Sequence, residues 1–204
     1  MTPNRLVLAL VLALAAPRAR ADAAPDPLAE SYRLQNKNDL AGAIKATRKA
    51  IDATPSAYFP RIRLAYLDTL AGDWSGAAAA YHSAGELAPG ALEPLLGEQL
   101  AQNALGRWDD AEAIGKRVVA IDPLNYLGRS RLAWSRYKKK DFRGAAELYA
   151  GLVALYPGDI DMRVGLGWAL YGLGRKPDAA AAFREVLTMV PGLASATEGL
   201  AAAK

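Results

Sequence analysis

The sequence predicts an all-α fold: an α/α superhelical solenoid of about five helix–turn–helix repeats plus a C-terminal capping helix. Five prolines stand 34 residues apart, and an alanine, small enough to let two helices approach closely, precedes each of them by twelve residues. Runs that alternate apolar and polar residues are absent, so no strand is expected. One such unit cannot bury its own apolar face, whereas stacked units can, and they build an open curved surface. The prolines are Pro55, Pro89, Pro123, Pro157 and Pro191, and the alanines are Ala43, Ala77, Ala111, Ala145 and Ala179.

The first 21 residues are predicted to be a secretory signal peptide that lies outside the fold. Arg5 precedes an apolar run at residues 6–16, and Ala19-Arg20-Ala21 offers small residues before a cleavage point at Asp22. The run is too short to span a hydrocarbon core of about 30 Å as a helix. We therefore expect a protein of the periplasm, or one secreted beyond it, with no stable membrane span after cleavage. An uncleaved anchor is the alternative.

The repeat register follows when each proline is counted as position 32 of its 34-residue unit. The units then start near residues 24, 58, 92, 126 and 160. Several units have glycine at position 15, where the first helix must end, or aspartate at position 16, where a carboxylate can cap the second helix. These residues are Gly72, Gly106 and Gly174, and Asp39, Asp73 and Asp141. We expect one solenoid domain over residues 24–204, closed by a capping helix at 193–203.

The last unit resembles the tetratricopeptide repeat. The residues that carry this resemblance are Leu166, Gly167, Gly174, Ala179, Phe183 and Pro191, and it extends over roughly residues 24–192. Units one and three depart from the pattern. Glu30 and Glu98 replace a leucine at position 7, while Thr47 and Gly115 replace an aromatic residue at position 24. How these two units pack is therefore left open.

The resemblance implies a concave groove lined by positions 2, 5, 9, 12 and 13 of the first helices. The candidate groove residues are Tyr66, Leu100, Asn103, Trp134, Tyr137, Lys138, Trp168 and Tyr171. Residues three apart share a helix face, so units four and five each present a Trp–Tyr pair. These rings either fill space between first helices or form an exposed platform for a ligand. The second interpretation is favoured because other residues occupy the core columns of the repeat.

The net charge and the residue composition argue against several classes of function. Loss of three arginines with the signal peptide lowers the net charge from +4 to +1, which gives no general reason to expect nucleic-acid binding. The chain has no cysteine, which excludes disulfides, thiolate sites and a cysteine-linked lipid anchor. His82 is the only histidine and is interpreted as a surface residue. With no zinc spacing and no phosphate loop, we expect no enzyme, no metal and no cofactor.

These observations predict a non-enzymatic protein–protein interaction scaffold or adaptor of the bacterial cell envelope. A protein or peptide segment would lie in the concave groove. One alternative is handling of a polysaccharide by an export or cell-wall assembly, because sugar rings also stack on aromatic faces. Another is a structural module that self-associates through its exposed end repeats. Seven cations in unit four, from Arg129 to Arg143, are interpreted as a solvated turn, or else as a site for an acidic partner.

Overall fold

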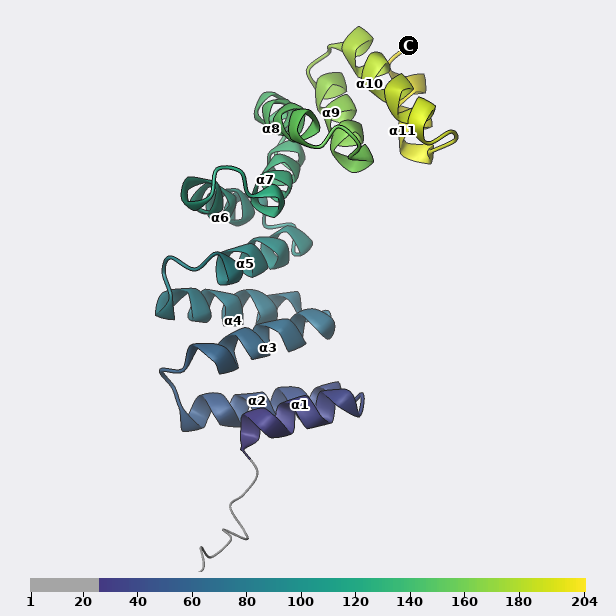
Figure 1. Ribbon diagram of the computed structural model, residues 1–204. Helices are drawn as coiled ribbons and strands as arrows, with labels where there is room; N and C mark the ends of the chain where they lie inside the picture. The colour runs from purple at the N-terminus through teal and green to yellow at the C-terminus, as the bar shows by residue number, and fades with distance from the viewer. Residues whose placement is uncertain (1–25) are drawn as a thin grey trace, which may run out of the picture.

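The computed structural model describes residues 26–204, and the predicted signal peptide lies outside the described residues. Within this part the chain forms eleven α-helices and no strand, so the predicted all-α solenoid is confirmed (Figure 1). The helices are α1 (Pro27–Asn36), α2 (Leu40–Ala53), α3 (Tyr58–Leu70), α4 (Trp74–Leu87), α5 (Leu92–Ala104), α6 (Trp108–Ile121), α7 (Tyr126–Lys138), α8 (Phe142–Leu155), α9 (Ile160–Gly172), α10 (Lys176–Met189) and α11 (Ala194–Ala202).

Helices with odd and even numbers play different parts in the stack. Each helix packs on its neighbours in sequence, so the hairpins pile up along one direction before the stack bends near α8 and α9 (Figure 1). In addition, α3 contacts α5, α5 contacts α7, and α7 contacts α9. The first helices of successive repeats therefore form a continuous inner wall, and the second helices form the outer wall.

The local signals in the sequence act where they were expected. Asp39, Asp73 and Asp141 each accept a hydrogen bond from the backbone N–H three residues later, at 2.8, 2.9 and 3.0 Å. Gly72, Gly106 and Gly174 have φ angles of 73°, 71° and 75°. Units one and four make the same left-handed turn without glycine, at Asn38 and Lys140.

Unit three compensates for its missing aromatic residue by exchanging large and small side chains between its two helices. In unit five the large ring of Phe183 at position 24 lies over the small Gly167 at position 8. In unit three position 24 is Gly115, and the fully buried Gln99 at position 8 fills that space. Its Nε2 donates to the Gly128 carbonyl at 3.2 Å. The Gln99 side chain thus takes the space beside Gly115 that a ring at position 24 would need.

Unit one replaces the aromatic contact with buried hydrogen bonds. Thr47 Oγ1 donates to Ser31 Oγ at 2.7 Å, and Arg63 Nε of the next repeat donates to the same Ser31 oxygen at 3.2 Å. All three side chains are buried. The departures from the repeat pattern in units one and three are thus accommodated within the regular solenoid.

Candidate functional site

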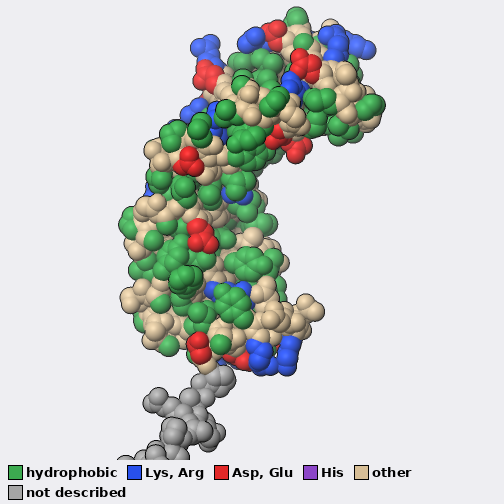
Figure 2. Space-filling view, in the orientation of Figure 1, with side chains coloured by type: hydrophobic (Ala, Val, Ile, Leu, Met, Phe, Trp, Pro, Cys, Tyr) green, Lys and Arg blue, Asp and Glu red, His purple; other side chains and the backbone are tan. Residues whose placement is uncertain are grey.

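A cavity of about 790 Å³ opens on the inner wall where the stack bends. Helices α5, α7 and α9 supply most of its lining, and α4, α8 and α11 complete it. Figure 2 shows hydrophobic side chains gathered along one face of the stack and at the bend. The lining is mostly apolar, with few polar groups, which is the usual composition of a binding pocket.

Five of the eight predicted groove residues line this cavity. They are Leu100, Asn103, Trp134, Tyr137 and Trp168. The other three lie elsewhere. Tyr66 is exposed on α3, nearer the N-terminus. Lys138 is exposed beside the cavity, and Tyr171 packs on the hydrophobic cluster of the C-terminal repeat.

The Trp–Tyr pair of α7 presents an indole to solvent. Trp134 is 43% exposed and stacks on Tyr137, with ring centroids 5.8 Å apart and planes at 19°. Tyr137 is held edge-on against Phe142, and burial raises the pKa of its phenol. Lys138 Nζ lies 5.2 Å from the ring centroid of Trp134 and 5.3 Å from that of Trp108. The exposed indole is therefore supported from behind and flanked by a cation.

The Trp–Tyr pair of α9 packs against the hydrophobic cluster of the last repeat instead, although Trp168 also lines the cavity. Trp168 packs edge-on against Phe183 at 5.2 Å, and its indole N–H donates to Ser195 Oγ of α11 at 3.0 Å. The ring of Tyr171 also lies edge-on to Trp168, with the two ring centroids 5.9 Å apart. The two interpretations left open by the sequence thus apply to different repeats: the rings of α9 fill space, while Trp134 offers a free face.

Asn103 places an unpaired amide at the cavity. Both polar atoms of its side chain are shielded from solvent, and neither has a hydrogen-bond partner within residues 26–204. Its neighbours in the lining include Leu100 and Trp134. An amide without a partner in such surroundings is a candidate for contact with a ligand.

Two lining residues were not among the candidates although the sequence marks them. Position 6 alternates between arginine and glycine from unit two onward, as Arg63, Gly97, Arg131 and Gly165. The glycines make room for rings of the preceding repeat; a Cβ on Gly165 would lie 2.7 Å from the Tyr149 ring. Tyr149 and Arg131 therefore both reach the cavity. Arg131 Nη1 donates to the Leu96 carbonyl at 2.8 Å, and burial lowers the pKa of the guanidinium.

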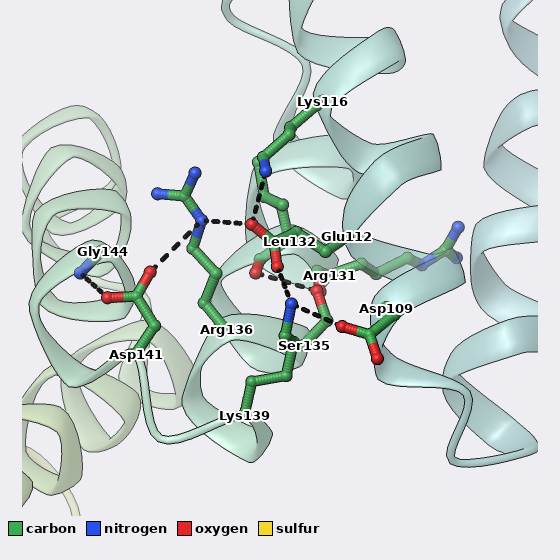
Figure 3. A network of polar contacts seen from close by, with 10 residues as sticks. All are labelled: Asp109, Glu112, Lys116, Arg131, Leu132, Ser135, Arg136, Lys139, Asp141 and Gly144. Atoms are coloured by element: carbon green, nitrogen blue, oxygen red, sulfur yellow. Dashed lines mark hydrogen bonds and ion pairs between the residues drawn. The ribbon is translucent and has the colours of Figure 1, made fainter.

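Two of the seven cations of unit four, Lys139 and Arg136, form ion pairs that join repeats three and four (Figure 3). Lys139 Nζ lies 2.6 Å from both Asp109 and Glu112, and Lys116 lies 2.7 Å from Glu112. Arg136 approaches Glu112 at 3.5 Å. Hydrogen bonds from Lys116 and Lys139 lower the pKa of Glu112 to about 2. This network is therefore structural, and it leaves fewer cations for an acidic partner than the sequence suggests.

Other kinds of site have little support in the described part of the chain. Across residues 26–204, no three His, Cys, Asp or Glu side chains come together as metal ligands would. None of the helices in that range is both long and apolar enough to cross a membrane. His82 is exposed, and its Nδ1 lies 3.0 Å from Glu98 Oε1 on α5.

Comparisons with known proteins agree with this architecture. The protein-family model of the tetratricopeptide repeat matches residues 130–194. No curated protein matches the chain in sequence. Among solved structures, a tetratricopeptide repeat protein from Parabacteroides merdae superposes with a TM-score of 0.78 at 16% identity, over 87% of this chain and 70% of the other.

Two further structures have the same fold. MamA from Desulfovibrio magneticus gives a TM-score of 0.73 at 16% identity, over 80% of this chain and 93% of its own. YrrB, a TPR protein with an unusual peptide-binding site, gives 0.68 at 22% identity, over 78% and 82% of the two chains. Residues 130–194 thus match the tetratricopeptide repeat family, and residues 26–204 share the fold of solved tetratricopeptide repeat structures.

Proposed function

We propose that the protein is a non-enzymatic scaffold of the bacterial cell envelope that holds a segment of a partner protein in the cavity between α5, α7 and α9. Solenoids of this kind use their extended concave surfaces for binding. The cavity is lined mainly by the first helices of three successive repeats, which supports this proposal. A ligand that crosses several repeats is elongated, as a polypeptide segment is.

The unpaired amide of Asn103 is the observation that carries this proposal. An unpaired buried polar group costs about 1–3 kcal/mol, so the fold gains little by keeping one. A peptide backbone offers both an N–H donor and a C=O acceptor, which are the complements of the two Asn103 atoms. A rotation of the side chain toward the cavity would bring them together. The peptide-binding site of YrrB makes a peptide a reasonable ligand for this fold.

The apolar residues that line the cavity favour an apolar side chain in the bound segment. Trp134 presents its free indole face, and Leu100 lies on the neighbouring first helix. A single aromatic contact adds about 0.5–1.5 kcal/mol beyond the area it buries. An apolar side chain of the partner against Trp134, combined with backbone contacts at Asn103, would anchor the segment across two repeats.

Affinity capture with matched variants tests this proposal. The immobilised chain is exposed to an extract of the source cells, alongside Trp134→Ala, Asn103→Ala and Tyr66→Ala. Tyr66 stands at the same repeat position as Trp134 and is also exposed, yet it does not line the cavity. We expect Trp134→Ala to weaken capture by about tenfold or more, as loss of a central anchor does. The proposed binding site would be refuted if Trp134→Ala captured as much partner as the wild type does. It would also be refuted if Tyr66→Ala reduced capture as much as Trp134→Ala does.

The envelope location is a separate proposal that rests on the predicted signal peptide at residues 1–21. Fractionation of the source cells, followed by intact mass measurement, tests it. The expected product is found in the periplasm and begins at Asp22. A cytosolic product that retains Arg5 would rule this location out while leaving the groove untouched.

A further inference from the structure

The outer wall contains a second hollow, on the opposite side of α5 from the cavity. It has a volume of about 570 Å³, lies between α4 and α6, and is floored by Glu98 and Gln102 of α5. These two residues are four apart and share one helix face. Leu100 and Asn103, which line the inner cavity, lie on the other face of the same helix. Helix α5 therefore presents residues to hollows on both walls.

The chain supplies its own comparison for this outer hollow. The equivalent place beside α8 and α9 is a hollow of about 540 Å³ with Leu166 and Leu170 as its floor. Glu98 and Leu166 both stand at position 7, and Gln102 and Leu170 both stand at position 11. The solenoid thus accepts an apolar floor at this place. Single polar residues stand at these positions elsewhere, as Glu30, Asp68 and Arg136, but repeat three is the one repeat in which both positions are polar.

The polar floor is also costly, because its groups are buried and incompletely paired. Glu98 is 8% exposed and Gln102 is 9% exposed. In the described chain, His82 Nδ1 is the one hydrogen-bonding partner of the Glu98 side chain, and Gln102 Oε1 has none. Buried polar groups that break the local pattern without a structural gain are characteristic of functional sites.

The surroundings of the floor determine what it can hold. Small and apolar side chains form the walls, namely Ala78, Ala79, Ala113 and Ile114. The floor offers a carboxylate and an amide oxygen, both of which accept hydrogen bonds. Lysine and arginine side chains combine an aliphatic stem with a head that only donates hydrogen bonds. Such a side chain would pack its stem against the alanines and pair its charge with Glu98.

We propose that the α4–α6 hollow binds a lysine or arginine side chain projected from a protein partner. Three charged residues line the hollow besides Glu98, namely Arg107, Asp110 and Arg117. All three are exposed, so solvent and salt screen them far more than the buried carboxylate. Arg107 and Arg117 would donate hydrogen bonds to acceptor groups that flank the basic residue of the partner. This site is independent of the inner cavity.

An NMR titration of the ¹⁵N-labelled chain, residues 22–204, tests the inference with small probes. The probes are the N-acetyl methylamides of lysine and arginine, and the norleucine derivative serves as the neutral control. We expect the two basic probes to shift the signals of Gln102, Ala78 and Ala113 saturably, and the norleucine probe to leave them in place. The same shifts should persist in Trp134→Ala. Equal shifts with norleucine, or no shifts at all, would overturn the proposal.

Two variants separate binding from folding. Glu98→Leu combined with Gln102→Leu reproduces the floor of the α8–α9 hollow, and Gln102→Leu alone removes an amide oxygen that has no partner. Both variants should lose the shifts caused by the basic probes while unfolding at temperatures no lower than the wild type. Retained shifts in the double variant, or a marked fall in the unfolding temperature of Gln102→Leu, would show that the polar floor serves the fold.

Discussion

At the scale of single residues, two tryptophans at the same repeat position have different tasks. Trp168 packs on Phe183 and donates to Ser195, while Trp134 stacks on Tyr137 beside Lys138 of the same helix and is 43% exposed. The difference arises from the partners of Trp168, which are Phe183 of α10 and Ser195 of α11. Sequence position alone therefore does not separate a structural ring from an exposed one.

The first prediction concerns the stability of these two positions. Trp168→Ala should lower the free energy of unfolding by about 3 kcal/mol or more, because it removes a large packed side chain. Trp134→Ala should lower it by less than Trp168→Ala does, since Trp134 is already 43% exposed to solvent. Urea unfolding followed by far-UV circular dichroism measures both. Equal losses would mean that Trp134 is a packing residue, which would remove it from the groove.

The second prediction concerns Glu112, whose pKa is lowered from 4.5 to about 2 by Lys116 and Lys139. Because the folded state has the lower pKa, the network stabilises the fold above pH 4.5, and this contribution is lost as the pH falls toward 2. Glu112→Gln should cost about 2 kcal/mol at pH 7, as a charged hydrogen bond does.

The cost of Glu112→Gln should shrink when urea unfolding is repeated at pH 3, because the carboxylate is then protonated in the unfolded wild type while it stays mostly ionised in the folded one. Glu86→Gln, at an exposed carboxylate of α4, is the matched control and should have little effect at either pH. A loss for Glu112→Gln that is the same at both pH values would contradict an electrostatic role for the network.

At the scale of helices, α11 closes the stack by packing on one ring. Phe183 is fully buried between Gly167 of α9 and Gly199 of α11. A Cβ on Gly199 would lie 2.3 Å from the Phe183 ring. Glycine is therefore required at position 199 because the two helices approach closely there. Its backbone conformation does not require glycine, since Gly199 is not among the glycines with a positive φ angle.

The third prediction is that Gly199→Ala loosens α11. The added methyl group forces the helix off Phe183, and overpacking of this kind costs about 1–3 kcal/mol. Hydrogen exchange should speed up in α11 and the end of α10 while α4 and α5 keep their protection. Gly158→Ala is the control, because a Cβ there meets nothing within 4 Å. Unchanged exchange in α11 would show that the cap does not depend on this contact.

The helices were largely predictable from the sequence, whereas the contacts between them were not. The 34-residue period fixes where helices begin, and the caps at Asp39, Asp73 and Asp141 act through backbone atoms three residues away. Such signals are local, so one chain suffices to see them. Two of the contacts between helices join residues that are sixteen apart in sequence. Gln99 fills the space beside Gly115, and Glu98 is buried beside His82. Their meaning depends on packing that the period does not encode.

At the scale of the whole molecule, the apolar core is uneven along the stack. The four clusters of buried apolar residues found in residues 26–204 all lie between α4 and α11. The first repeat is held instead by alanines and by the hydrogen bonds of Ser31 and Thr47. In a solenoid each repeat is stabilised mainly by its neighbours, so stability can differ from one end to the other.

The fourth prediction is a gradient of protection along the chain. Native-state hydrogen exchange should be fastest in α1 and α2 and slowest in α8 to α10, because local opening begins where the fewest apolar contacts must be broken. Peptide-level mass spectrometry measures this directly. Uniform protection across all repeats would indicate a single cooperative unit and contradict the repeat-by-repeat account.

The account as a whole depends on the inner wall being the surface that meets a partner. Ala104 lies exposed in the lining of the cavity, and Leu87 lies exposed at the end of α4 without lining it. A photo-crosslinking amino acid is placed at each position in turn, in the source cells. We predict that position 104 forms a discrete protein adduct that Trp134→Ala abolishes, and that position 87 does not form it. Adducts from position 87 alone, or adducts at position 104 that survive Trp134→Ala, would contradict the account.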